Sequence, residues 1–147
     1  MYTTLQFLHS YWAYIVLFMV LIATLNALAG FFGGKEFQSK DQRISLFALI
    51  VTHIQFLLGI ILYVISPLGI KSISNNGMAT VMKDSLLRLF AVEHITVMIL
   101  AVILITIGYS KHKKKQEPKS KFKTIAIFYT LAFIFMLSRI PWQQWFN

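Results

Sequence analysis

The chain has 147 residues, of which 57% are hydrophobic and 13% are charged, and its net charge is +9. A soluble domain has about 45–50% apolar and about 25% charged residues, so this composition excludes an ordinary soluble domain and indicates an integral membrane protein. The absence of cysteine excludes disulfides, iron–sulfur clusters, thiolate metal sites and covalent c-type haem.

The first apolar segment covers residues 5–32, and a helix needs about 20 residues to cross a bilayer. No Lys or Arg precedes this segment, and it is longer than the roughly 7–15 residues of a signal-peptide core. We therefore expect a retained membrane span. His9 lies seven residues beyond Tyr2, which places it about 10 Å along the helix at 1.5 Å per residue.

Three further apolar segments follow at residues 44–66, 85–109 and 122–140. Asp84 is suited to cap the start of the third of them. The runs are continuous rather than alternating, which predicts helices and not the strands of a barrel. We predict an all-α integral membrane protein with one domain, residues 1–147, folded as an up-down bundle of four transmembrane helices.

Lysine and arginine predict the orientation of the bundle. Ten of the 14 basic residues lie between the first and second or the third and fourth segments. The positive-inside rule then places both termini and the loop 67–84 outside, and the lysine-rich loop in the cytoplasm. This distribution argues against nucleic acid as a partner. We expect His112 to be a solvated residue of that loop, Pro118 to interrupt it, and residues 72–80 to form an exposed turn.

Ionisable side chains inside membrane spans are costly and usually mark a functional site. The predicted spans contain His9, His53, Glu93 and His94. The first and third helices of an up-down bundle are diagonal neighbours, which favours His9 and His94 as the two axial ligands of one b-type haem iron. His53 matches His94 in estimated depth, about 15 Å from the respective helix start, so His53 with His94 is the second choice. A three-histidine zinc or copper site is another possibility.

Arg88 and Arg139 lie near the outer ends of the third and fourth spans. Arginine suits the two propionates of a haem, because its guanidinium is planar and always charged. The alternative is that Arg88 extends to the membrane surface and Arg139 pairs with Glu93. Glu93 lies about 100° around the helix from His94, so it points away from a haem there and would pair with a neighbour or carry protons near a quinol.

Three stretches carry a resemblance to a known group of proteins: LHSYWAYIVLFMVLIA, HIQFLLGIILYVISP and MKDSLLRLFAVEHITVMILAVILITIGYSK, together with the closing IPW. They resemble short bacterial four-span proteins labelled cytochrome b. The order of His, His-x-x-x-x-x-Gly and Glu-His in successive spans is also similar to one four-helix half of haem A synthase. That resemblance implies haem ligation by His9 and His94. Many of these small proteins have Arg-Trp soon after the first histidine, whereas this chain has Trp12-Ala13.

We therefore expect a haem b protein of the bacterial inner membrane that transfers electrons between a quinone or redox partner and the outer face. A chain of this size has no room for its own nicotinamide or flavin domain, so we expect another membrane or redox protein subunit as partner, besides the lipid bilayer. The alternative is a cofactor-free accessory or assembly subunit of a larger complex. A transporter is disfavoured, because no span is broken near its middle.

Overall fold

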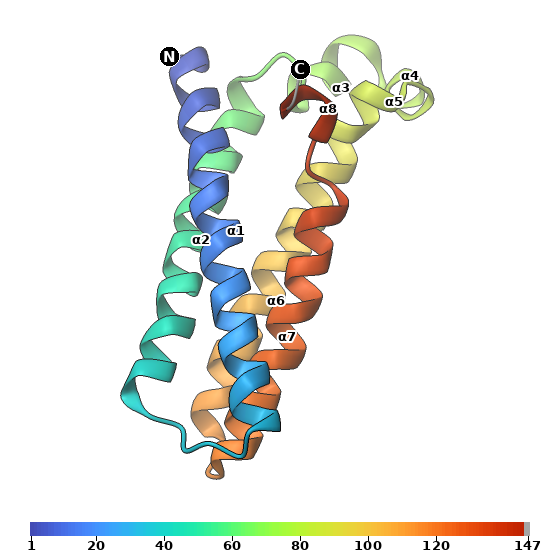
Figure 1. Ribbon diagram of the computed structural model, residues 1–147. Helices are drawn as coiled ribbons and strands as arrows, with labels where there is room; N and C mark the ends of the chain where they lie inside the picture. Colours follow the sequence, from blue (N-terminus) through green and yellow to red (C-terminus); the bar gives the residue numbers. More distant parts are fainter. Residues whose placement is uncertain (146–147) are drawn as a thin grey trace.

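The computed structural model describes residues 1–145 of the chain, and these contain helices and no strand. Four of these helices are long, and a segment of short helical turns connects the second long helix to the third at one end of the molecule (Figure 1). The long helices are α1 (Tyr2–Phe32), α2 (Ser39–Ile65), α6 (His94–Lys114) and α7 (Pro118–Ser138). The short elements are α3 (Ile70–Asn76), α4 (Met78–Lys83), α5 (Ser85–Arg88), the π-helical turn η1 (Leu89–Glu93) and α8 (Trp142–Trp145).

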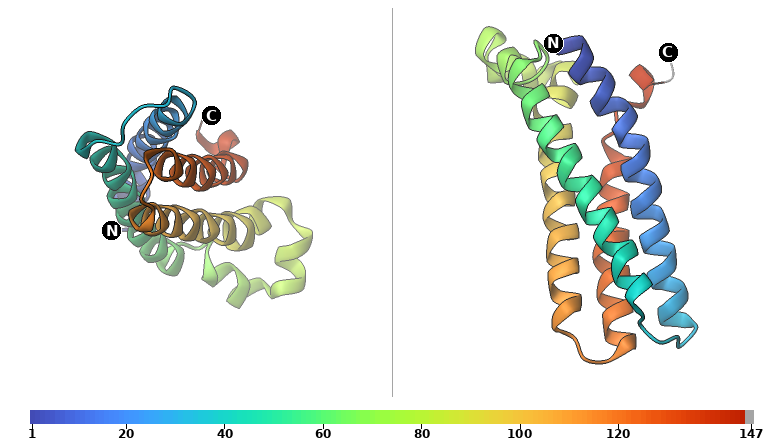
Figure 2. Two further views of the ribbon diagram at one scale, coloured as in Figure 1. Left: turned by 90° about the horizontal axis from the view of Figure 1, so that it is seen from below. Right: turned by 90° about the vertical axis from the view of Figure 1, so that its left-hand side faces the viewer.

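Four helical segments are long and apolar enough to cross a membrane, and these properties indicate a multi-pass membrane protein. The prediction of an all-α bundle with four such helices is confirmed. The main contacts run between α1 and α2, α1 and α7, α6 and α7, and α2 and α6. As Figure 2 shows in the view along the bundle, α1 and α6 are therefore diagonal. Both ends of the described chain lie at one end of the bundle, here called the terminal end.

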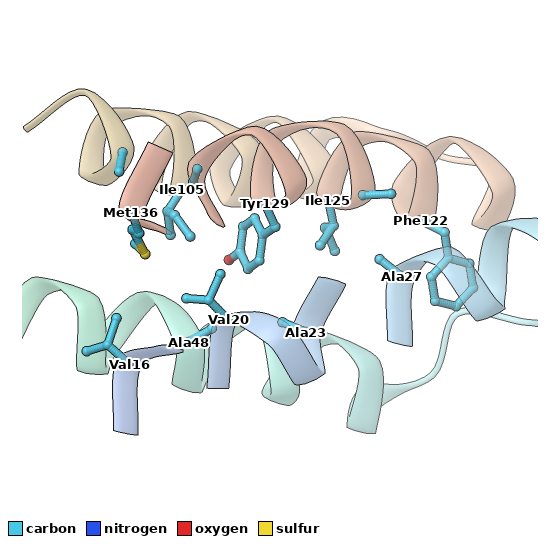
Figure 3. Packing of buried hydrophobic residues seen from close by; sticks show 13 residues of the cluster. Val16, Val20, Ala23, Ala27, Ala48, Ile105, Phe122, Ile125, Tyr129 and Met136 are labelled. Atoms are coloured by element: carbon cyan, nitrogen blue, oxygen red, sulfur yellow. The ribbon is translucent and has the colours of Figure 1, made fainter. Parts of the chain in front are cut away.

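The core of the bundle lies between α1 and α7, where small side chains let the helices approach closely. One buried stripe on α1 faces a row of buried side chains on α7 that includes Tyr129 (Figure 3). The α1 stripe consists of Val16, Val20, Ala23 and Ala27. The Tyr129 hydroxyl donates to the Ser45 carbonyl oxygen at 2.8 Å and so ties α7 to α2. Packing of small residues is the usual source of helix association in lipid, because lipid tails are as apolar as the side chains.

The lysine-rich segment is more helical than the sequence indicates. Helix α6 continues to Lys114 instead of ending near residue 109, and Pro118 begins α7 instead of interrupting a loop. Proline is well suited to the first turn of a helix, because the amide hydrogen that it lacks would have no partner there. Only three residues, Lys115–Glu117, separate the two helices, and we call this end of the bundle, with residues 33–38, the basic end.

His112 is buried, so the prediction of a solvated histidine was wrong. Its side chain has no exposed surface, and its ring packs against Tyr109 and Phe37, with ring centroids 4.8 and 5.5 Å away. The Nδ1 atom bonds the Tyr109 carbonyl, and the Lys121 ammonium donates to the His112 carbonyl at 3.1 Å. The helical extension of α6 brings His112 under the α1–α2 connection, which the sequence did not indicate.

The segment before α6 also differs from the predicted turn. Residues 70–83 form the helices α3 and α4, which meet at Gly77 with a φ of 83°, a conformation that favours glycine. Asp84 caps α5 as expected, because its Oδ1 accepts from the amides of Leu86 and Leu87, both at 3.0 Å. The π-helical turn η1 then leads directly into His94. Such turns are often found at functional sites.

Candidate functional site

A cavity of about 320 Å³ lies in the half of the bundle nearest the terminal end. All four long helices contribute to its wall, and most of the lining side chains are apolar. Its volume is in the range of small-molecule and cofactor sites, about 300–1,000 Å³. Two of its lining residues are histidines, His9 of α1 and His94 at the start of α6.

The structure brings His9 and His94 together across the diagonal of the bundle. Their ring centroids are 6.2 Å apart, and the ring planes are nearly perpendicular at 81°. These two side chains are the pair that the sequence ranks first. The diagonal placement of α1 and α6 explains why both rings reach the same central cavity. Side chains on two neighbouring helices would instead meet at the contact line between those two helices.

The ring of His94 is held by the end of α7. Its Nδ1 lies 2.7 Å from the carbonyl oxygen of Arg139. A carbonyl oxygen only accepts, so Nδ1 carries the hydrogen and Nε2 of the neutral ring keeps its lone pair. Helix α7 ends at Ser138, shortly before Pro141, which leaves the Arg139 carbonyl without a helical partner. Metal-binding histidines are typically oriented by such a bond.

The ring of His9 lies against α2. A Cβ atom added to Gly59 would come to 3.1 Å from Cε1 of His9, so the ring occupies the space that the glycine leaves. The amide Nε2 of Gln55 donates to the His9 carbonyl at 2.8 Å. Nδ1 of His9 and Oε1 of Gln55 are buried and have no hydrogen-bond partner within residues 1–145. Buried polar atoms without a partner are uncommon and call for an explanation.

Arg88, Glu93 and Arg139 lie beside the cavity but do not line it. Arg88 Nε lies 3.4 Å from Glu93 Oε2, and its Nη1 donates to the Met82 carbonyl at 2.7 Å. Glu93 therefore pairs with Arg88 and not with Arg139, because the turn η1 places it on the same helical segment as Arg88 and facing it. Arg139 Nη1 donates to the carbonyl of the neighbouring Ser138.

His53 lies elsewhere, and the structure does not bring it to His94. Its Nε2 is 2.9 Å from Thr106 Oγ1, on the seam between α2 and α6. Thr106 is twelve residues beyond His94 on the same helix, which separates the two levels by about 18 Å. The described residues contain no group of three or more His, Cys, Asp or Glu that could hold a metal ion. The structure therefore does not bring His9, His53 and His94 together as a three-histidine site.

We compared the chain with known proteins. No family model, curated protein or solved structure matches it. The interpretation of the cavity therefore rests on its own geometry.

Three features of the site escaped the sequence analysis. The contribution of Arg139 comes from its backbone carbonyl, which no side-chain pattern reveals. Tyr63 donates to the Ala91 carbonyl at 2.7 Å, inside the π-helical turn that precedes His94. Gln55 of α2 donates to the His9 carbonyl of α1, and its place in the sequence, two residues after His53, does not indicate this contact.

Proposed function

We propose that this chain binds one b-type haem between His9 and His94 and transfers electrons between a quinone or redox partner and the terminal face of the membrane. The observation that carries the proposal is the pair of imidazoles 6.2 Å apart in one mostly apolar cavity, with a buried Nδ1 of His9 that has no partner in the described chain.

The spacing of the rings supports a shared metal. Imidazole nitrogen binds metals at about 2.0–2.1 Å, so two rings with centroids 6.2 Å apart would be close enough to hold one ion between them. The oriented Nδ1 of His94 leaves its Nε2 available as a ligand atom. A haem bound there would supply one-electron redox chemistry. The chain itself would supply the two ligand nitrogens, the low dielectric of the cavity and a wall that excludes water.

The arginines are proposed as partners of the two propionates. Arg88 lies between the cavity-lining residues Leu86 and Phe90, and Arg139 lies between the cavity-lining Met136 and Ile140. Each arginine is therefore within three residues along the chain of residues in the cavity wall. Arg88 would exchange its contact with Glu93 for a propionate, since both are carboxylates.

We place the protein in the bacterial inner membrane with its terminal end outward. Support comes from the ten basic residues at the basic end, which the positive-inside rule assigns to the cytoplasm. The chain has no cysteine, so single substitutions Ser74→Cys and Lys115→Cys can report each side separately. In intact cells a membrane-impermeant maleimide should label Ser74→Cys and not Lys115→Cys, and the reverse pattern would refute this orientation.

The haem proposal is tested by a reduced-minus-oxidised visible spectrum of the protein purified after expression with added haem. The wild type should give a b-type spectrum with about one haem per chain. His9→Ala and His94→Ala should each abolish six-coordinate haem, because each removes one axial ligand. His53→Ala is the matched control and should retain the spectrum, since His53 lies on the α2–α6 seam.

Two results would refute the proposal: a haem-free wild type, or a His94→Ala variant with an unchanged spectrum. A folded wild-type protein without haem would favour the alternative, a cofactor-free accessory or assembly subunit of a larger membrane complex.

A further inference from the structure

The basic end carries more positive charge than the chain itself neutralises. Ten Lys and Arg side chains lie there with three acids, Glu36, Asp41 and Glu117. The one ion pair among residues 1–145 joins Arg88 to Glu93 near the terminal end, so none of the ten is paired. Asp41 is buried and already accepts from the Asn26 amide at 2.9 Å and from a backbone amide at 2.7 Å.

The N-terminus of α7 adds to this positive charge. Helix α7 has no acidic residue in its first turn, where the helix dipole favours negative charge. Lys119 and Lys121 occupy that turn instead. The Lys121 ammonium is fixed above Phe37, 5.5 Å from the ring centroid, and donates to the His112 carbonyl. An anion bound at this end would reduce the repulsion between these cations.

Two of the lysines continue directly into apolar, exposed stripes. On α6, Lys111 is followed at intervals of four residues by Ile107 and Ile103, which are 38% and 46% exposed. On α7, Lys123 is followed in the same way by Ile127 and Leu131, which are 47% and 43% exposed. Residues four apart share one face of a helix. Each stripe therefore has a cation at the basic end and an apolar surface toward the middle of the bundle.

The two helices meet closely at this level. Lys111 Nζ lies 5.6 Å from the centroid of Phe128 on α7. Gly108 permits the contact, because a side chain at this position would collide with Phe128. We call the two exposed stripes together, which comprise Lys111, Ile107 and Ile103 on α6 and Lys123, Ile127 and Leu131 on α7, the α6–α7 lipid face.

We propose that the α6–α7 lipid face binds an anionic phospholipid, with the headgroup phosphate at Lys111 and Lys123 and the acyl chains along the isoleucines and Leu131. The combination of cations that form no ion pair with apolar stripes on the same helices matches the two halves of such a lipid. A soluble phosphate would use the cations alone, and a nucleic acid would not use the apolar stripes. The proposal is independent of haem binding, because the face lies outside the His9–His94 cavity.

The test measures lipid retention by native mass spectrometry of the delipidated full chain in detergent. Dioleoyl phosphatidylglycerol is titrated against dioleoyl phosphatidylcholine, which has the same acyl chains and no net charge. Each basic residue near an anionic lipid contributes about fivefold in affinity, so K111Q/K123Q should bind phosphatidylglycerol about 20- to 30-fold more weakly than the wild type. K111R/K123R should bind like the wild type, and both variants should unfold at the wild-type temperature in phosphatidylcholine.

The matched control is K71Q/K83Q, which removes the same charge from the other end of the chain and should leave lipid retention unchanged. Equal retention of the two lipids by the wild type would overturn the proposal, as would an equal loss in K71Q/K83Q. Glycerol phosphate, which lacks acyl chains, distinguishes the source of the phosphate. If it raises the unfolding temperature as much as phosphatidylglycerol does, the site is for a soluble anion and the lipid proposal is wrong.

Discussion

Gly59 of α2 lies directly against the imidazole of His9: a Cβ atom at position 59 would come to 3.1 Å from Cε1 of that ring. The substitution Gly59→Val should therefore displace the His9 ring from its place in the cavity. Overpacking of this kind costs about 1–3 kcal/mol, which predicts haem binding weaker by about fivefold or more. The measurement is haem content per chain during titration with haemin. An unchanged affinity for haem would show that haem binding does not require the His9 ring in this position.

A second glycine provides the control for Gly59→Val. A side chain at Gly30 would collide with the ring of Phe122 at the basic end, far from the cavity. Gly30→Ala should lower the unfolding temperature in detergent and leave the haem content of the folded protein unchanged. If both variants lose haem to the same degree, the effect of Gly59→Val results from lower stability of the whole protein and not from the position of the His9 ring.

Tyr63 stabilises the π-helical turn that precedes His94, because its hydroxyl donates to the Ala91 carbonyl at 2.7 Å. Tyr63→Phe keeps the ring and leaves this carbonyl with one partner fewer, at a cost of about 1 kcal/mol. We expect a modest decrease in unfolding temperature and a shift of the haem midpoint potential, since the turn sets the direction of His94. Redox titration compares the variant with Tyr14→Phe, whose ring stacks on Trp145. Equal potentials in all three proteins would refute a role of Tyr63 in positioning His94.

The pair Arg88–Glu93 is partly exposed, with side-chain exposures of 33% and 31%. Exposed ion pairs contribute about 0–1 kcal/mol, so a double-mutant cycle with Arg88→Gln and Glu93→Gln should give a coupling free energy below about 1 kcal/mol. Arg88→Gln should be the more destabilising single change, because it also removes the bond to the Met82 carbonyl at 2.7 Å. Chemical unfolding in detergent measures both quantities. A larger effect of Glu93→Gln would contradict this ranking.

Asp41 connects α1, the α1–α2 connection and α2 through its two carboxylate oxygens, which accept from Asn26 and from the Gln38 amide. Its side chain is buried, and Asp41→Ala removes the acceptor of the half-buried Asn26 amide and of the backbone amide of the exposed Gln38, at about 1 kcal/mol for each bond. Asp41→Asn keeps one acceptor oxygen and should lose about half as much. Glu36→Gln, on an exposed residue of the same connection, should have little effect in the same unfolding experiment. Equal stability of all three variants would refute the bridging role.

The number and approximate position of the four long helices followed from continuous apolar runs, because bilayer thickness sets a minimum length that few other segments reach. The ends were less accurate. Helix α6 continues five residues past Tyr109 because lysine is a good helix former, although it is too polar for the membrane interior. An apolar run in the sequence therefore indicates only the part of a helix that lies in lipid, and it does not indicate how far the helix continues into water.

The sequence placed His9 and His94 in one half of the bundle and on diagonal helices, and the structure brings their rings together. The second choice, His53 with His94, was wrong, because the depth of a residue counted from its helix end does not tell which neighbouring helix the side chain faces. The prediction for His112 was also wrong, because its burial depends on Phe37 from a distant connection. Contacts between elements far apart in the chain leave no periodic signal in a single sequence.

The diagonal placement of His9 and His94 has a consequence for biosynthesis. His9 enters the membrane with the first span, His94 with the third, and the carbonyl of Arg139 that orients His94 follows at the end of the fourth. A ligand that requires both rings in this arrangement can be inserted only after translation has reached the last helix. Under the proposed function, loading of the haem would therefore be a post-translational step on a complete bundle.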